Sequence, residues 1–164
     1  MADIAKPPKG KRNVKSLVFV YGSLKKGLHN NVVLGDSNLI HHGHTADKYL
    51  LRSLGSFPGV DITAENATSY IYGEVYSCDP DTLRRLDNLE GYPTFYDKIE
   101  VDVVVGNGAT TITATMYHLA NPKEHKGTTI SSGIWKEEAY LTDFFSNRSQ
   151  KWTKSSIPER NRLK

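Results

Sequence analysis

The hairpin signal at Asn107-Gly108 constrains the fold of this chain most. Every second residue from Ile99 to Val105 is aliphatic, and charged side chains alternate with them at the start of the run. This alternation is typical of a strand with one buried face. Asn-Gly tolerates the positive φ angles of a tight turn, and a second run, Thr110–Leu119, follows it. The sequence therefore predicts an antiparallel hairpin between Tyr96 and Leu119.

Three further segments read as strands. Leu17–Val20 is apolar and β-branched, and Ser69–Ser77 alternates so that its tyrosines and Glu74 share one face. Lys48–Leu51 can form a short strand. Gly55–Val60 is turn-rich, and its proline cannot donate a hydrogen bond to a ladder.

A helix is predicted from Pro80 to about Glu90. Asp79 is a favourable N-cap, proline is tolerated at the first helical position, and Gly91 favours termination. Leucines spaced by three give the helix a core-facing stripe at Leu83, Leu86 and Leu89.

Two shorter helical segments are also expected. One begins after Asn30 or Asn31, either of which is a candidate cap, and the other has helical spacing from Trp135 to Phe145. Because strands and helices do not alternate regularly, a doubly wound sheet is disfavoured. The pattern predicts an α+β fold: a small mixed β-barrel of five to six strands with two or three helices.

Two polar segments, Asp36–Asp47 and Asn121–Ser132, are expected to be variable loops. The first contains His41-His42-Gly43-His44, and histidines are common metal ligands. No cysteine or carboxylate stands at ligand spacing beside them, so a solvent-facing turn is the favoured interpretation and no metal is expected.

The charge distribution divides the chain into three parts. Residues 1–16 carry a net charge of +4 and residues 147–164 a net charge of +5, whereas residues 17–146 hold ten basic and sixteen acidic residues. We therefore expect one domain over 17–146 between a flexible basic N-terminal arm and a basic C-terminal tail. The basic ends are candidates for a weak contact with nucleic acid or another acidic surface, and solvated ends are the alternative.

Composition limits the cellular compartments in which this chain is expected. One cysteine, Cys78, rules out an intramolecular disulfide and suits a reducing compartment. No apolar run reaches the ~18 residues of a membrane-spanning helix, and the N-terminal residues lack a signal-peptide core. A cytoplasmic location without a membrane partner is expected.

The candidate site starts where the first strand ends, at Tyr21-Gly22-Ser23-Leu24. Glycine at this position can adopt positive φ and, lacking a Cβ, lets backbone N–H groups approach a ligand. Successive N–H groups turned one way bind an anion or an oxyanion. An ordinary strand–turn is the alternative for this segment taken alone.

A second stretch, Leu86-Asp87-Asn88-Leu89-Glu90-Gly91-Tyr92-Pro93, lies before Tyr96. Together with the Tyr21–Leu24 loop, Phe57-Pro58, Gly73-Glu74-Val75-Tyr76 and Ser132-Gly133 with Trp135, it resembles the γ-glutamylcyclotransferase family, which includes γ-glutamylamine cyclotransferases and AIG2-like proteins. The resemblance covers about three quarters of the chain. It implies a barrel fold and an enzyme that needs no cofactor.

The resemblance also implies a reaction. The α-amine of a γ-glutamyl amide attacks the side-chain carbonyl of the same molecule and releases 5-oxoproline and an amine or amino acid. Glu90 matches the family's catalytic glutamate and would act as general acid and base. The end of a helix and partial burial beside Tyr92 and Tyr96 would raise the pKa of this carboxyl from its ordinary value toward neutrality.

The expected substrate-binding residues are Tyr21, Gly22, Ser23, Leu24 and Tyr96. Ser23 is expected to donate a hydrogen bond rather than attack, since no histidine base is placed near it. Tyr96 is expected to line the pocket and hydrogen-bond the substrate, with a structural aromatic at the strand start as its alternative. Glu74 is the competing carboxylate, for which surface exposure or a salt bridge is expected.

Two other functions stay open from sequence. The same pocket could hold or cleave a different small amino-acid conjugate, with or without catalysis. Alternatively, the barrel could be a scaffold whose basic ends contact nucleic acid, which added salt would weaken steeply.

Deletion of the basic ends tests the domain boundaries. Removing residues 1–15 should leave stability and small-molecule turnover unchanged. Removing residues 148–164 should lower Tm by a few degrees at most, because Trp152 and Ile157 could pack on the domain and one large buried apolar side chain contributes roughly 1.5–3 kcal/mol. Thermal melts and product formation measure both effects. Loss of turnover after the N-terminal deletion alone would contradict the single-domain prediction.

Overall fold

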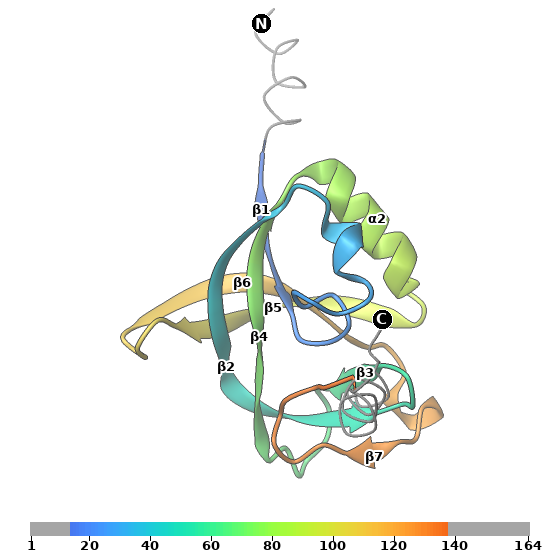
Figure 1. The fold of residues 1–164 in the computed structure, drawn as a ribbon. Helices are drawn as coiled ribbons and strands as arrows, with labels where there is room; N and C mark the ends of the chain where they lie inside the picture. The colour runs from blue at the N-terminus through green and yellow to red at the C-terminus, as the bar shows by residue number, and fades with distance from the viewer. Residues whose placement is uncertain (1–13, 138–164) are drawn as a thin grey trace, which may run out of the picture.

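A curled β-sheet is the framework of residues 14–137, the part of the chain that the computed structural model describes (Figure 1). Its strands are β1 (Ser16–Val20), β2 (Asn38–Ser53), β3 (Pro58–Asp61), β4 (Ser69–Cys78), β5 (Tyr96–Val105), β6 (Thr110–Leu119) and β7 (Thr128–Thr129). The helical segments are the α-helix α2 (Pro80–Glu90) and the 3-10 helices η2 (Asn31–Leu34) and η3 (Pro122–Glu124).

Five strands close into a barrel. They follow the order β2-β4-β1-β6-β5, and β5 pairs again with β2. β1 is parallel to β6 and antiparallel to β4, so the barrel is mixed. The remaining strands, β3 and β7, pair with the second half of β2. The predicted α+β barrel is confirmed, with these two extra strands and with one α-helix in the described residues.

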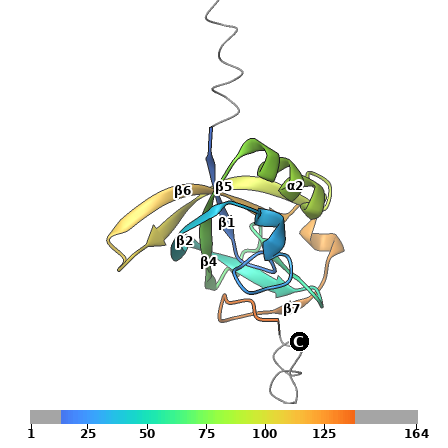
Figure 2. The ribbon, with the colours of Figure 1, turned by 45° about the horizontal axis from the view of Figure 1, so that its top comes forward.

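The apolar side chains form two cores. The first fills the barrel and includes Phe19, Ile71, Val103 and Met116. The second lies between the barrel wall and the α2–η2 pair and includes Val18 and other buried residues. Figures 1 and 2 show α2 and η2 side by side against the same part of the barrel. Because β1 contributes side chains to both cores, its position is fixed from both faces.

The helix α2 has the predicted bounds and caps. The Asp79 carboxylate accepts a hydrogen bond of 2.8 Å from the Thr82 N–H, and Gly91 ends the helix with φ 64°. The predicted leucine stripe is only partly right: Leu86 is fully buried, whereas Leu89 is 42% exposed. A spacing of three falls short of the 3.6-residue turn, so successive leucines rotate away from the core.

The expectation of a loop over Asp36–Asp47, with its histidines in a turn, is wrong. These residues belong mostly to β2, in which Gly43 pairs with both β4 and β5. Register shifts between Leu39 and His41, and between His44 and Lys48, interrupt the alternation of this strand. The pairing partners lie far away in sequence, and the bulges remove the period-two pattern that identifies a strand locally.

Two other expectations change. The loop Asn121–Ser132 contains η3 and β7, and Trp135 to Glu137 are not helical. The Trp135 carbonyl accepts a hydrogen bond of 2.9 Å from Lys25 Nζ, which ties this segment to the loop after β1. The rest of the predicted helix, residues 138–145, lies outside the described residues, as do residues 1–13 and the tail 147–164. Within residues 14–137, no helix has the length and apolar character required to cross a membrane.

Candidate active site

A cavity of about 430 Å³ opens where β1 and α2 end. The six residues that sequence analysis singled out all border it: Tyr21, Gly22, Ser23, Leu24, Glu90 and Tyr96. The first four follow β1, Glu90 is the last residue of α2, and Tyr96 begins β5. The fold thus brings three separate segments to one cavity.

Glu90 has an unusual carboxyl group. Its side chain is partly buried in the cavity wall, and no donor among residues 14–137 forms a hydrogen bond or ion pair with it. Burial raises the pKa of Glu90 from 4.5 to about 7, because desolvation disfavours the charged form. This carboxyl can therefore accept or release a proton near neutral pH.

The cause of the raised pKa differs partly from the one expected. Burial is the resolved cause. Tyr92 is not part of the cavity lining: it is 39% exposed, and Lys98 Nζ lies 4.1 Å from its ring centroid. Tyr96 does border the cavity beside Glu90, as expected.

The loop after β1 presents a row of backbone donors. Lys25 N–H donates to the Gly22 carbonyl and Asn30 N–H donates to the Ser23 carbonyl, both at 3.0 Å. No acceptor among residues 14–137 is bonded to the N–H groups of Gly22, Ser23 and Leu24. These N–H groups are therefore available to a negatively charged ligand.

Gly22 is required for space, and the expectation of positive φ is wrong. Its φ lies outside the positive region that other glycines of the chain adopt. A Cβ at this position would lie 2.9 Å from Pro58 Cγ, closer than real Cβ contacts. The absent side chain lets the loop pack directly against Pro58 at the start of β3.

The phenols of Tyr21 and Tyr96 are engaged with the backbone. Tyr21 donates to the Tyr117 carbonyl at 2.9 Å and accepts from the Val60 N–H at 3.2 Å. Tyr96 donates to the Pro58 carbonyl at 2.5 Å. Burial and then the Glu90 charge raise the pKa of the Tyr96 phenol. Since its proton is committed to Pro58, Tyr96 can act towards a ligand only as an acceptor.

The Ser23 hydroxyl has a proton that it can donate to a ligand. Its hydroxyl accepts a hydrogen bond of 2.8 Å from Asn30 Nδ2, which leaves the hydroxyl proton free for a ligand. Asn30 does not form a side-chain cap on η2. It orients Ser23 instead.

Of the two alternatives expected for Glu74, surface exposure is wrong, and a salt-bridge contact with His42 is found. The Glu74 side chain is buried, with the residue 7% exposed, and it does not border the cavity. Its contact with His42 is long, 3.7 Å from Nε2 to Oε2.

Several cavity residues were not predicted. Phe57 and Phe95 form an edge-to-face pair with centroids 5.9 Å apart, and His29, Ser56 and Asn88 also border the cavity. Except for Asn88, which is on α2, they come from turns and loop segments without periodicity. Phe57 and Asn88 belong to the motifs that carry the family resemblance, and this was the available signal.

Metal binding is not indicated by the described residues. Among positions 14–137, no three His, Cys, Asp or Glu side chains are arranged to hold an ion. The three histidines of β2 lie along a strand, where neighbouring side chains point to opposite faces.

Comparison with known proteins identifies the family. A family model described as "Gamma-glutamyl cyclotransferase, AIG2-like" matches residues 18–137. The chain belongs to this family. It is 37% identical over 121 residues to the Methanocaldococcus jannaschii protein named "Putative gamma-glutamylcyclotransferase", covering 73% of this chain and 95% of that one. It is 36% identical over 92 residues to the human gamma-glutamylaminecyclotransferase, covering 51% of this chain and 58% of the human one.

Solved structures agree with this assignment. YkqA from Bacillus subtilis is 33% identical with a TM-score of 0.62, over 79% of this chain and 42% of the longer YkqA chain. An AIG2-like protein from Mus musculus shares the fold at 24% identity with a TM-score of 0.62, over 73% of this chain and 88% of that one. The predicted family and enzyme class, a γ-glutamylcyclotransferase-like enzyme, are confirmed.

The raised pKa of Glu90 predicts how stability depends on pH. Folding raises this pKa from 4.5 to about 7, so the ionised carboxylate opposes folding. The penalty is absent below pH 4.5, develops between 4.5 and 7, and is complete above 7. Glu90→Gln, which mimics the neutral form, should therefore raise Tm by about 2–6 °C at pH 8 and leave it unchanged at pH 4.

Thermal melts of both proteins across this pH range measure the effect. Glu100→Gln removes an exposed carboxylate on β5 and is the matched control, expected to follow the wild type throughout. A Tm difference for Glu90→Gln that is equal at pH 4 and pH 8 would contradict the assigned pKa.

Proposed function

We propose that this enzyme cleaves a γ-glutamyl amide by attack of the substrate's α-amine on its own side-chain carbonyl. The products are 5-oxoproline and an amine or amino acid. One observation carries the proposal: a carboxyl that titrates near neutral pH and three free backbone donors border the same cavity. The names of relatives, such as the human gamma-glutamylaminecyclotransferase, support the substrate class.

Glu90 acts first as the general base. The substrate's α-amine is an ammonium group at neutral pH and cannot attack until it loses a proton. Ionised Glu90 takes this proton, and a base with a pKa near the working pH is most effective. The freed nitrogen then forms a bond to the side-chain carbonyl carbon, whose π electrons move onto oxygen.

The loop after β1 binds the negative charge of the substrate or of the tetrahedral intermediate. The N–H groups of Gly22, Ser23 and Leu24 bind the substrate's carboxylate or the oxyanion of the tetrahedral intermediate. The Ser23 hydroxyl supplies one more donor. These donors are held by the fold before the charge develops, so they cost little reorganisation during the reaction.

Collapse of the intermediate completes the reaction. Protonated Glu90 gives its proton to the leaving nitrogen, and the ionised carboxylate then takes the second proton from the attacking nitrogen. The oxyanion re-forms the carbonyl, the bond to the leaving nitrogen breaks, and Glu90 passes this second proton to the released amine. The lactam nitrogen is then neutral, the amine leaves as an ammonium ion, and Glu90 is again ionised. The edge-to-face aromatic pair, Phe57 and Phe95, forms part of the wall available to the leaving group.

A panel of γ-glutamyl amines and γ-glutamyl dipeptides tests this function. Release of 5-oxoproline, followed by mass spectrometry, is expected for at least one member. Binding of the panel compounds without 5-oxoproline release would instead support a non-catalytic binder of amino-acid conjugates.

Glu90→Gln should bind the substrate and lose turnover. General acid–base catalysis typically contributes about 10²–10⁴-fold, so kcat should fall by at least about 10²-fold. In the wild type, kcat/KM should decline as pH falls below about 7, where Glu90 becomes protonated. The measurement is steady-state 5-oxoproline formation. A variant that keeps more than about a tenth of the activity would remove Glu90 from the base role.

Gly22→Val should abolish ligand binding. The added side chain meets the Pro58 ring and displaces the loop that carries the free N–H groups. Calorimetric titration with 5-oxoproline measures the loss. Lys26→Ala changes an exposed side chain of the same loop, keeps its backbone N–H, and is the control that should bind as the wild type does. Equal affinity in Gly22→Val would show that this loop is not the anion site.

A further inference from the structure

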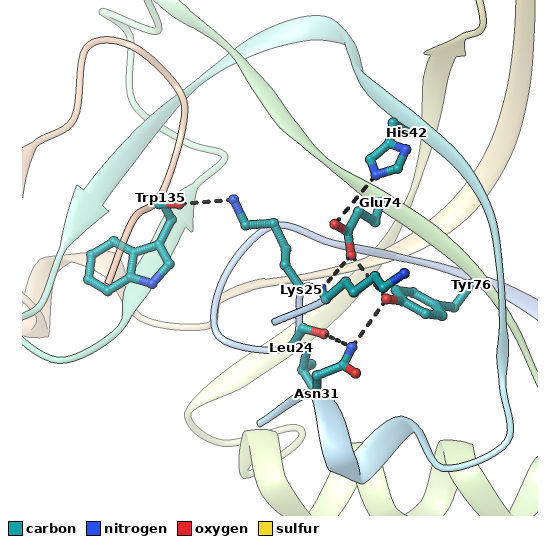
Figure 3. A network of polar contacts seen from close by, with 8 residues as sticks. Leu24, Lys25, Asn31, His42, Glu74, Tyr76 and Trp135 are labelled. Atoms are coloured by element: carbon teal, nitrogen blue, oxygen red, sulfur yellow. Dashed lines mark hydrogen bonds and ion pairs between the residues drawn. The ribbon is translucent and has the colours of Figure 1, made fainter. Parts of the chain in front are cut away.

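The buried carboxylate of Glu74 has no role in the reaction just described. It lies on β4, directly opposite Val20, the last residue of β1. Figure 3 shows the Glu74 side chain from close by. Its Oε1 accepts hydrogen bonds from the Lys26 N–H at 2.8 Å and from the Tyr76 hydroxyl at 3.0 Å. The first of these bonds fixes the middle of the loop that borders the cavity.

Asn31 fixes both ends of the same loop. Its Nδ2 group donates to the Leu24 carbonyl at 2.8 Å and to the Tyr76 hydroxyl at 3.1 Å. Figure 3 shows the resulting path from Leu24 through Asn31 and Tyr76 to Glu74. Leu24 and Lys26 are thereby tied to one strand of the barrel by a single set of hydrogen bonds.

The charge of Glu74 determines which group donates and which accepts in each of these hydrogen bonds. An ionised carboxylate only accepts hydrogen bonds, so each group that faces Oε1 must present a donor. Tyr76 therefore gives its proton to Glu74 and presents a lone pair to Asn31. Asn31 in turn has two N–H hydrogens, one for Tyr76 and one for Leu24. Bonds to a charged acceptor are about twice as strong as neutral ones, and a buried carboxylate without donors is costly.

We propose that Glu74 is a positioning residue for the active-site loop. It holds the backbone of Leu24–Asn31 in the conformation that leaves the N–H groups of Gly22–Leu24 free for the substrate's negative charge. It acts through Lys26, Tyr76 and Asn31, and it does not border the cavity itself. This inference rests on the proposed function of the loop.

Four variants separate positioning from other roles. Glu74→Ala removes the acceptor, and Glu74→Gln keeps an amide oxygen for Lys26 and Tyr76. Tyr76→Phe removes the hydroxyl that links Glu74 to Asn31. The matched control is His42→Ala, which removes the long contact to Oε2 of Glu74 and leaves both bonds to Oε1 in place.

Kinetics on a γ-glutamyl amide provide the first readout. Displacement of a positioned group by about 1 Å can cost 10²-fold, so Glu74→Ala should lower kcat/KM by roughly 10–100-fold, mainly by raising KM. Tyr76→Phe should change it in the same direction by less. Glu74→Gln should recover most of the loss, and His42→Ala should remain within about twofold of the wild type. In all four variants the decline of kcat/KM below about pH 7 should persist, because Glu90 is unchanged.

Amide hydrogen exchange provides a readout that needs no substrate. The hydrogen-bonded amides of Lys25, Lys26 and Asn30 in this loop should exchange faster in Glu74→Ala than in the wild type, and at the wild-type rate in His42→Ala. If the wild type turns over no γ-glutamyl compound, the proposed function fails while this measurement still decides whether Glu74 holds the loop.

Three outcomes would overturn the proposal. One is a Glu74→Ala enzyme with wild-type loop exchange and kcat/KM within about threefold. Another is a Glu74→Gln enzyme that is as impaired as Glu74→Ala although its loop amides exchange at the wild-type rate, which would assign the kinetic effect to the charge and not to the position of the loop. The third is loss of the decline below pH 7 in Glu74→Gln, which would make Glu74 itself the titrating base.

Discussion

The pairing of β1 with both β4 and β6 is the constraint on which the rest of the structure depends. This five-residue strand is antiparallel to one neighbour and parallel to the other, and its side chains enter both cores. Each large apolar side chain that it buries contributes roughly 1.5–3 kcal/mol. The end of β1 is therefore placed by packing on two faces, and the aperiodic loop that follows starts from a fixed point beside Pro58 and the end of α2.

Three carboxylates near the cavity differ in their hydrogen-bond donors, and this difference suits them to different roles. Asp87, one turn before the end of α2, accepts a hydrogen bond of 2.6 Å from Tyr117 and lies 3.0 Å from Lys98 Nζ, which fixes the helix to β5 and β6. Glu74 is buried with two donors at one oxygen. Glu90 is partly buried, and no donor is bonded to it among residues 14–137. Burial raises the pKa of Glu90 to about 7.

Sequence patterns predicted the helices and strands that are determined by residues close together in the chain. The bounds of α2, the β5–β6 hairpin and the strand β4 follow from caps, an Asn-Gly turn and alternation. The six expected site residues, Tyr21–Leu24, Glu90 and Tyr96, border one cavity, and the family resemblance supplied the long-range information that local patterns lack. Local patterns could not predict three features: the first half of β2, the burial of Glu74, and the close contact of Gly22 with Pro58. Each depends on a partner distant in sequence and on a segment without periodicity.

The free groups of the cavity are complementary to one another. The N–H groups of Gly22–Leu24 have no acceptor and the Glu90 carboxylate has no donor among the described residues. A collapse of the loop onto the helix end would pair these donors with the carboxylate. Two tethers oppose this collapse: Glu74 and Asn31 hold the loop to β4, and Asp87 holds the helix to β5 and β6. In the proposed mechanism, the space kept open between donors and base is where the substrate's negative charges and its amine are bound.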